Sequence, residues 1–303
     1  MKTEIIILSG FLGSGKTTLL KNLLLLEKER KRKTAVLMNE FGSISIDSEI
    51  IGDDVPLKEL LGGCICCTIQ DKLEGQIQEL LVEHKPEVIY IETTGAAHPV
   101  EVLDAIMSPL FANLLSIKGI ITVLDGRRWL DRKLLSPQLQ QLVIEQVRHA
   151  DLILLNKSDE LSEVEQMQVT IGIQSVNPHA ECVMTTFSKV GRQQIEKVAM
   201  KKKDFTVNSN AKNLNLSSFV YQFKSSISQD DFESFLKNLP DSIYRIKGYV
   251  KFPHSSQPFL FQFSYGMPLY IREEMNLPLN LVFIGEDIDW NHIHEQLLKL
   301  ELK

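Results

Sequence analysis

The sequence has few cysteines, no long hydrophobic run and no surplus of positive charge. Only four of its 303 residues are cysteine, too few for the disulfide framework of a small secreted protein. No stretch approaches the roughly 18 consecutive apolar residues of a membrane-spanning helix, and the first apolar run, Ile5–Leu8, does not resemble a secretion signal. The 33 Lys and Arg against 39 Asp and Glu give a net charge of -6. These absences predict a cytoplasmic protein that binds neither nucleic acid nor membranes.

The length and the order of apolar segments predict two domains. In residues 1–200, short runs rich in Ile, Val and Leu alternate with amphipathic segments such as Asp71–His84. Such runs are typical of parallel strands that helices bury on both faces. We therefore expect a doubly wound, mostly parallel α/β domain. Its predicted strands are Glu4–Leu8, Ala35–Asn39, Val88–Ile91, Gly119–Leu124, Asp151–Leu155 and Cys182–Thr186.

The second half of the chain has a different pattern. The polar segment 201–213 interrupts the alternation and is predicted to be a linker. After it, apolar and polar residues alternate in several short segments, which is typical of half-buried strands. Residues 214–303 therefore predict a smaller α+β domain. Its predicted strands are Asn215–Phe223, Ile243–Phe252, Phe259–Phe263 and Leu281–Gly285, and its predicted helices are Gln229–Leu239 and Trp290–Leu300.

A phosphate-binding loop follows the first predicted strand. The segment Gly10–Thr17 matches G-x-x-x-x-G-K-[ST], and a Leu-rich helix is predicted to start at Lys16. Backbone N–H groups of such a loop form a nest for phosphate oxygens, and glycine allows the close approach. Lys16 is expected to bridge the β- and γ-phosphates, and the Thr17 hydroxyl to bind Mg²⁺. The residues of this segment predicted to bind nucleotide are Gly10, Gly13, Ser14, Gly15, Lys16, Thr17 and Thr18.

The segment Asn156–Asp159 (NKSD) ends a later predicted strand and favours guanine. The Asp159 carboxylate can accept hydrogen bonds from guanine N1–H and the exocyclic amino group, whereas adenine presents an acceptor at N1. Asn156 is expected to contact guanine N7 or a neighbouring loop, and the Lys157 stem to cover the purine. Ligands of open α/β sheets bind at this carboxyl edge. The motif alone is weak, but together with the phosphate loop it predicts a GTP or GDP site.

Three of the four cysteines, Cys64, Cys66 and Cys67, fall within four positions. Three thiols do not complete the four-ligand shell of a structural zinc. With a carboxylate, imidazole or water as fourth ligand, they suit a soft cation that must later leave, such as zinc or copper(I), with cobalt as another candidate. The alternatives are small buried side chains and a redox pair. Their place between the phosphate loop and the strand before Glu92 favours metal, because GTPases keep γ-phosphate-ordered elements there.

Two glutamates follow predicted strands at the same edge of the sheet. Glu92 is expected to hold the water shell of Mg²⁺ or align the attacking water, and Gly95 to offer its N–H to the γ-phosphate. Glu40 could serve magnesium, the catalytic water or the thiolate-bound metal. For both glutamates the alternative is a solvated carboxylate at a strand end. His98 is a weaker ligand candidate, since the residue before a proline is equally typical of a turn.

These segments together resemble the CobW family of GTP-dependent metal chaperones, relatives of the UreG and HypB nickel-insertion GTPases. The resemblance rests on Gly10–Leu20, Asn39–Gly42, Gly63–Cys67, Glu92–Gly95 and Asn156–Asp159, and in the second domain on Arg245–Gly248 and Leu281–Gly285. It implies slow GTP hydrolysis coupled to holding and delivering a transition metal, most often zinc. The implied partner is a metal-requiring client protein. A homodimer is left open.

The sequence also departs from the family pattern. Met38 and Ser43 occupy places where some relatives carry glutamates implicated in metal binding, and no histidine-rich stretch is present. A high-capacity metal store is therefore not expected. Cys64, Cys66, Cys67 and Glu40 remain as the predicted metal shell.

Two other functions compete with a GTP-dependent metallochaperone. In the first, the protein is a P-loop ATPase or small-molecule kinase in which the NKSD segment is accidental. In the second, it is a GTP-switched binding module with structural cysteines. Nucleotide competition separates the first alternative, and the metal content of the purified protein separates the second.

Overall fold

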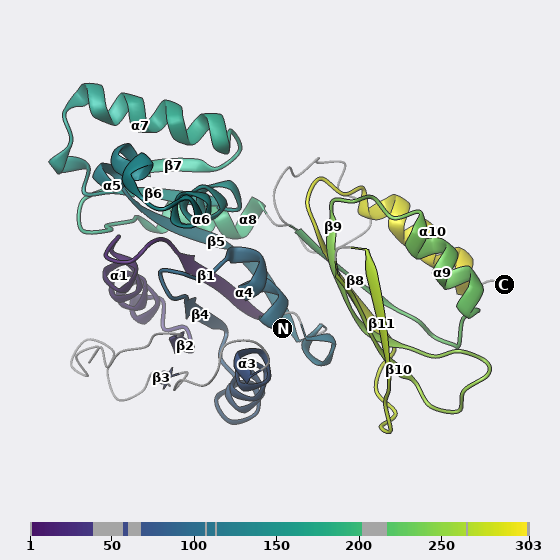
Figure 1. The fold of residues 1–303 in the computed structure, drawn as a ribbon. Coiled ribbons are helices and arrows are strands. Elements are labelled where there is room, and N and C mark those ends of the chain that lie inside the picture. Colours follow the sequence, from purple (N-terminus) through teal and green to yellow (C-terminus); the bar gives the residue numbers. More distant parts are fainter. Residues whose placement is uncertain are drawn as a thin grey trace. The chain divides into compact units, whose positions relative to one another are not determined.

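The computed structural model describes residues 2–38, 57–59, 68–106, 108–112, 114–201, 217–264 and 266–301 (Figure 1). Contacts divide the chain into two units. The first comprises Met1–Ile106 and Leu114–Lys202, and the second Met107–Asn113 and Lys203–Lys303. The predicted domains, 1–200 and 214–303, stay a prediction, because most of the predicted linker lies outside the described residues.

Seven parallel strands form the sheet of the first unit, in the order β3-β2-β4-β1-β5-β6-β7. They are β1 Thr3–Ser9, β2 Thr34–Met38, β3 Leu57–Glu59, β4 Val88–Glu92, β5 Leu115–Asp125, β6 Leu152–Asn156 and β7 Glu181–Met184. The ends of β1, β2 and β4 lie in register, with Leu8 and Met38 each opposite Glu92. The residues that follow these strands therefore leave the sheet at one edge, where ligands of such folds bind.

Helices cover both faces of this sheet, as strands of Ile, Val and Leu require. They are α1 Lys16–Glu29, α3 Thr68–Glu79, α4 Pro99–Ile106, α5 Gly126–Leu130, α6 Pro137–Arg148, α7 Glu163–Val176 and α8 Arg192–Lys201. Leu20 of α1 and Ile195 of α8 join one core cluster, while Trp129, Val143 and Ile173 of α5, α6 and α7 join the other. The predicted doubly wound, mostly parallel fold is confirmed.

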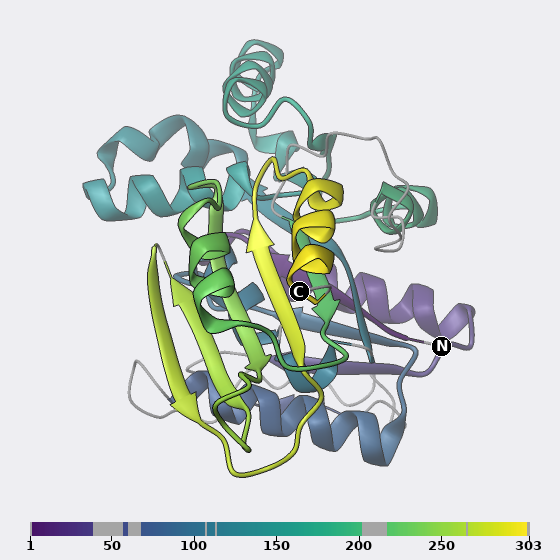
Figure 2. The same cartoon turned by 90° about the vertical axis from the view of Figure 1, so that its right-hand side faces the viewer.

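The second unit contains a five-stranded antiparallel sheet, in the order β11-β10-β9-β12-β8. Its elements are β8 Ser217–Gln222, α9 Gln229–Lys237, β9 Ile243–Val250, β10 Phe259–Ser264, β11 Met267–Arg272, β12 Asn280–Gly285 and α10 Trp290–Glu301. Helices α9 and α10 lie over one face (Figure 2), and Phe232 and Leu297 bury against Phe261 and Phe283 of the sheet. The smaller α+β fold predicted for this region is thus confirmed.

The structure shifts several predicted boundaries and adds strands β3 and β11. The predicted helix Asp71–His84 is α-helical only to Glu79 and continues as a π-helical turn, Leu80–His84. The strand predicted at Cys182–Thr186 ends at Met184, and the chain then turns through Phe187 and Ser188, whose φ values of 53° and 50° are not those of a strand. The predicted strand Gly119–Leu124 extends in both directions to become β5.

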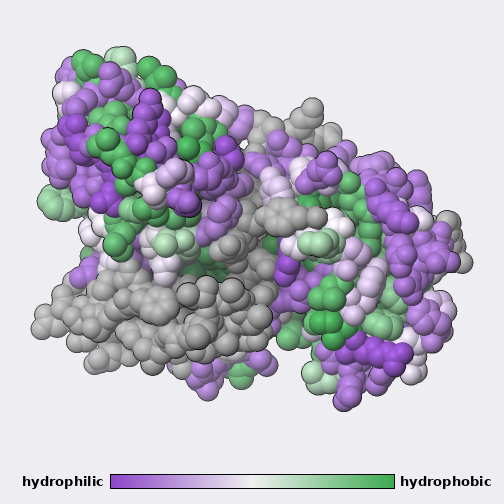
Figure 3. Space-filling view, in the orientation of Figure 1, coloured by the Kyte–Doolittle hydropathy of each residue, from purple (hydrophilic) through white to green (hydrophobic). Residues whose placement is uncertain are grey.

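The surface of α7 carries an apolar stripe. Val164, Met167 and Ile171 follow one another at helical spacing, and 66%, 64% and 60% of their surfaces are exposed. Figure 3 shows hydrophobic side chains over this helix.

Among the helices that the structure describes, none has the length and apolarity needed to cross a membrane.

Candidate functional site

The phosphate loop joins β1 to α1 and is built on glycines with positive φ. The φ angles of Gly10, Gly13 and Gly15 are 133°, 74° and 112°, which L side chains rarely adopt. A Cβ on Gly10 would lie 2.2 Å from the Val123 carbonyl oxygen, whereas one on Gly13 would meet nothing within 4 Å. The loop therefore needs glycine at position 10 for conformation and space, and at position 13 for conformation alone.

Ser14, inside the same loop, shows that the loop fits an oxygen-rich ligand. Its side chain is 1% exposed, and its Oγ atom is buried without a hydrogen-bond partner among the described residues. Buried polar groups are normally paired. A nest of backbone N–H groups beside an unsatisfied hydroxyl matches the oxygens of a phosphate.

The predicted phosphate and magnesium residues lie together at the start of α1. Lys16 is 4% exposed, and its Nζ lies 3.5 Å from the Phe11 carbonyl oxygen. The Thr17 hydroxyl donates to Oε1 of Glu92, 2.7 Å away, although the two residues are 75 positions apart. A hydroxyl and a carboxylate in contact form an all-oxygen donor set, which is the kind that Mg²⁺ prefers.

The residues after Glu92 pack directly on the phosphate loop. Both the backbone N–H and the hydroxyl of Thr93 donate to the Leu8 carbonyl oxygen, each at 3.1 Å. A Cβ on Gly95 would lie 2.5 Å from the backbone nitrogen of Leu12. Position 95 thus lies so close to the phosphate loop that only glycine fits there.

Asn156 connects the phosphate loop to a second loop. Its Nδ2 donates to the Ser14 carbonyl oxygen at 2.8 Å, and its Oδ1 accepts from the Ser188 backbone N–H at 2.8 Å. Of the two contacts expected for Asn156, the structure therefore has the one to neighbouring loop backbone. Sites that bind through several loops depend on such bridges to keep the loops in place.

Lys157 and Asp159 follow Asn156 in a tight turn. Lys157 has a φ of 56°, and its Nζ donates to Oδ2 of Asp125 at 2.6 Å. Burial raises the pKa of Asp125, but the hydrogen bond from Lys157 and the backbone N–H of Arg128 outweigh it, and the net pKa is lowered. Lys157 is thus held by a carboxylate that stays ionised at neutral pH. The side chain of Asp159, two residues later, is exposed to solvent.

The loop around Ser188 is a site element that sequence patterns missed. Ser188 is fully buried, and its hydroxyl donates to the Gly15 carbonyl oxygen at 3.0 Å. Asn22 of α1 donates from Nδ2 to the carbonyl oxygens of Phe187 and Ser188, each at 3.1 Å. Phe187 and Ser188 have φ values of 53° and 50°. Both residues thus have left-handed backbone conformations without being glycine, and no sequence pattern marks such a pair. Only the fold identifies this loop.

The predicted metal ligands lie outside the described residues. These are Glu40, Cys64, Cys66 and Cys67. Within the described residues, no group of three or more His, Cys, Asp or Glu side chains could hold a metal ion. His98 lies beside His149, with ring centroids 6.0 Å apart, and its role as a metal ligand stays a prediction. Burial raises the pKa of Cys182 to about 11, so this thiol is not ionised at neutral pH.

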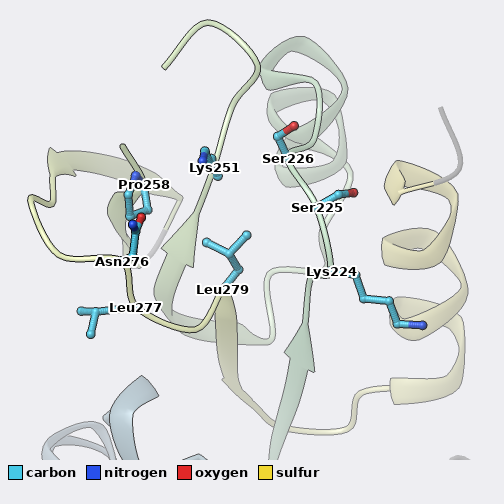
Figure 4. Close-up of a pocket in the computed structure, with 8 residues that line it drawn as sticks. All are labelled: Lys224, Ser225, Ser226, Lys251, Pro258, Asn276, Leu277 and Leu279. Carbon is cyan, nitrogen blue, oxygen red and sulfur yellow. The ribbon is translucent and has the colours of Figure 1, made fainter. Parts of the chain in front are cut away.

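A cavity of about 310 Å³ opens in the second unit (Figure 4). Its lining residues are Lys224, Ser225, Ser226, Lys251, Pro258, Asn276, Leu277 and Leu279. None of these eight side chains is a thiol, imidazole or carboxylate, the groups that bind transition metals. The cavity is therefore not a candidate metal site.

Both parts of the chain match known domains. Residues 4–184 match the nucleotide-binding domain described as CobW/HypB/UreG. Residues 216–301 match the C-terminal domain of the cobalamin synthesis protein CobW.

Curated relatives match over different lengths. The zinc chaperone YeiR of Escherichia coli is 38% identical over 50% of this chain and 46% of its own length. The zinc chaperone CobW of Pseudomonas aeruginosa is 34% identical over 53% of this chain and 50% of its own. The chain thus spans about half the length of these two relatives. The zinc chaperone YjiA of Escherichia coli is 30% identical over 84% of each chain.

A solved structure has the same fold. The crystal structure of the Zn(II)-bound YjiA GTPase from Escherichia coli has a TM-score of 0.50 and 22% identity, over 99% of both chains. Its Zn(II)-bound triple mutant has a TM-score of 0.53 at 21% identity, again over 99% of both chains. The two domain matches show that the chain belongs to the CobW/HypB/UreG family of nucleotide-binding proteins.

Proposed function

We propose that the protein is a GTPase that binds a transition metal, zinc foremost, and delivers it to a client protein in a nucleotide-dependent way. The observation that carries this proposal is the contact between Thr17 and Glu92, 2.7 Å long, beside the phosphate loop. It joins the hydroxyl that would hold a nucleotide-bound magnesium and the carboxylate that would hold its water shell. The names of the zinc-chaperone relatives support the cargo.

Each residue at the phosphate end has a proposed role. Lys16 neutralises charge on the β- and γ-phosphates, and the backbone of the phosphate loop, including Thr18, holds their oxygens. The Thr17 hydroxyl would hold Mg²⁺ and the Glu92 carboxylate would hold its water shell. When bound, Mg²⁺ stabilises the charge that develops during phosphoryl transfer. The alternative role of Glu92 is to align the attacking water, and Glu40 is the second candidate for this task. The backbone N–H of Gly95 donates to the γ-phosphate.

The guanine base is proposed to bind at the same edge of the sheet, at the end away from the phosphate residues. Asp159 is exposed and is proposed to accept hydrogen bonds from guanine. The Lys157 stem, fixed by Asp125, covers the purine face. Asn156 holds the Ser14 and Ser188 loops together, and the Ser188 loop forms the far wall of the base site.

The metal shell is proposed to comprise Cys64, Cys66, Cys67 and Glu40. The chain segment that carries them starts directly after β2, whose last residue, Met38, is aligned with Glu92. It ends at Thr68, where α3 begins. The segment therefore leaves the sheet beside the proposed magnesium ligand. A γ-phosphate and its Mg²⁺ can order such a segment and so gather the ligands, and hydrolysis releases it.

The cellular setting of this function follows from its chemistry. Three thiols that bind a metal must stay reduced, which fits a cytoplasmic protein. The partner is a protein that requires the metal, and a homodimer is the other candidate assembly. Cobalt is the second candidate cargo.

Removing two thiols should abolish tight metal binding and leave the nucleotide site intact. In a Cys66→Ala, Cys67→Ala variant we expect zinc affinity to fall more than about 100-fold, because even loss of groups that only support metal ligands costs about 10–100-fold. GTP affinity in the absence of metal should be unchanged. Competition against a chromophoric zinc chelator measures the first, and a fluorescent GTP analogue the second.

Cys182→Ala is the matched control for this experiment. It also removes a thiol, but one whose pKa of about 11 keeps it protonated, and it should bind zinc as the wild type does. Unchanged zinc affinity in the double variant would refute the proposed shell and favour a GTP-switched module with structural cysteines.

A further inference from the structure

The loop after Glu92 is held by a side chain that belongs to none of the sequence motifs. Gln146 lies near the end of α6 and is 1% exposed. Its Nε2 donates to the carbonyl oxygens of Gly95 and Ala97, at 3.2 Å and 3.3 Å. One buried amide thus satisfies two backbone acceptors of the same loop.

Gln146 is itself mounted on a rigid frame. Its backbone carbonyl oxygen accepts a hydrogen bond of 2.8 Å from the hydroxyl of Thr122 in β5, and Thr122 is fully buried. The flanking residue Val147 and the nearby Val143 belong to the core that α6 forms with the sheet. Groups that are locked by packing on both sides can define the position of whatever they bind.

The opposite side of the loop is fixed separately. Thr93 is bonded to Leu8 of β1, and Gly95 lies against Leu12 with no room for a Cβ. The Thr94–Gly95 peptide, which carries the Gly95 N–H, therefore lies between the anchor at Thr93 and the anchor at Gln146. If the Gln146 amide were lost, the anchor at Thr93 would remain, but the carbonyl oxygens of Gly95 and Ala97 would lose this donor.

We propose that Gln146 is a positioning residue for the γ-phosphate. By holding the carbonyl groups of Gly95 and Ala97, it keeps the Gly95 N–H where the terminal phosphate binds. This inference rests on the proposed guanine-nucleotide site. Because GDP has no γ-phosphate, Gln146 contributes to the binding and hydrolysis of GTP and not to the binding of GDP.

The test is the ratio of affinities for a non-hydrolysable GTP analogue and for GDP, measured with Mg²⁺ by calorimetry. Gln146→Met keeps the volume and removes the donor. We expect it to weaken the GTP analogue about tenfold, since one hydrogen bond contributes up to about a factor of ten to an equilibrium constant. GDP affinity should stay the same, and kcat for GTP should fall. Should Gln146→Met fail to fold, Gln146→Asn, which keeps the amide but shortens the side chain, should change the ratio in the same direction.

Asn177→Leu is the matched control. Asn177 is 3% exposed, and its Nδ2 donates to three carbonyl oxygens at and just after the end of the same helix, those of Val147, Arg148 and Ala150. Within the described residues, its side chain bonds to the end of α6 and to the turn at His179 and Ala180 and not to the loop after Glu92. Its loss should therefore lower the melting temperature without changing the affinity ratio.

Three outcomes separate the two levels of the hypothesis. A lower ratio of GTP-analogue affinity to GDP affinity in Gln146→Met, together with an unchanged ratio in Asn177→Leu, supports the inference. If the ratio in Gln146→Met equals that of the wild type, whether both affinities fall or neither does, the inference is overturned and the proposed function still stands. If the wild-type protein binds no guanine nucleotide, the proposed function fails, and the inference fails with it.

Discussion

An Asp159→Asn variant is expected to prefer xanthine nucleotides to guanine nucleotides. The carboxylate accepts from guanine N1–H and the amino group, whereas an amide can donate to the carbonyl oxygen that xanthine carries in place of that amino group. Sites built for one hydrogen-bonding group can reject the analogue that lacks it by about 10⁴–10⁵-fold. We therefore expect a reversal of preference of up to this size, measured by competition of GTP, XTP and ATP for the site.

The control for this reversal is the next carboxylate along the chain. Glu160 is exposed on the same 3-10 turn, Ser158–Glu160, and Glu160→Gln should leave the preference for GTP unchanged. If ATP competed as well as GTP in the wild-type protein, the base assignment would be wrong. A P-loop ATPase or small-molecule kinase would then be the better hypothesis.

Gly10→Ala is expected to have the largest effect on the folded nucleotide site. Gly10 has a φ of 133°, and a Cβ would lie 2.2 Å from a backbone oxygen of β5. Strain of about 1–3 kcal/mol and overpacking of about 1–3 kcal/mol should together lower the free energy of unfolding by about 2–6 kcal/mol. Since the clash lies in the phosphate loop, nucleotide binding should be lost as well. Urea unfolding and nucleotide titration measure the two effects.

Gly13→Ala separates the clash from backbone strain. Gly13 has a φ of 74° and open space around it, so an alanine there should cost only the backbone term, about 1–2 kcal/mol. Equal stability of the two variants would show that the loop relaxes freely at position 10. The loop would then not be the rigid cradle described above.

Most of the fold could be predicted because its signals are local. The Ile-, Val- and Leu-rich runs correspond to β1, β2, β4, β5, β6 and β7 within a few residues. The missed strand β11 contains Pro268, which argues against a strand, yet it is the edge strand of its sheet, where proline is tolerated. The strand β3 has only three residues and no periodicity to detect.

The site could be predicted only where a motif is contiguous. The phosphate loop and the NKSD segment are short patterns with a known chemistry. The Thr17–Glu92 contact follows from both residues lying at one sheet edge. In contrast, Gln146 and Ser188 are 51 and 173 positions from the residues they hold, Gly95 and Gly15. No periodicity or composition marks such a contact, because packing of the helices and sheet creates it.

The central claim is that the nucleotide and the metal affect each other's binding. The most direct measurement is the zinc affinity of the protein with a non-hydrolysable GTP analogue and with GDP. We predict tighter zinc binding in the GTP state, within the range of about 5–150-fold that is typical of coupled sites. Zinc should tighten GTP by the same factor, because linkage is reciprocal. Equal zinc affinities in the two nucleotide states would contradict the account, since hydrolysis could then release no metal.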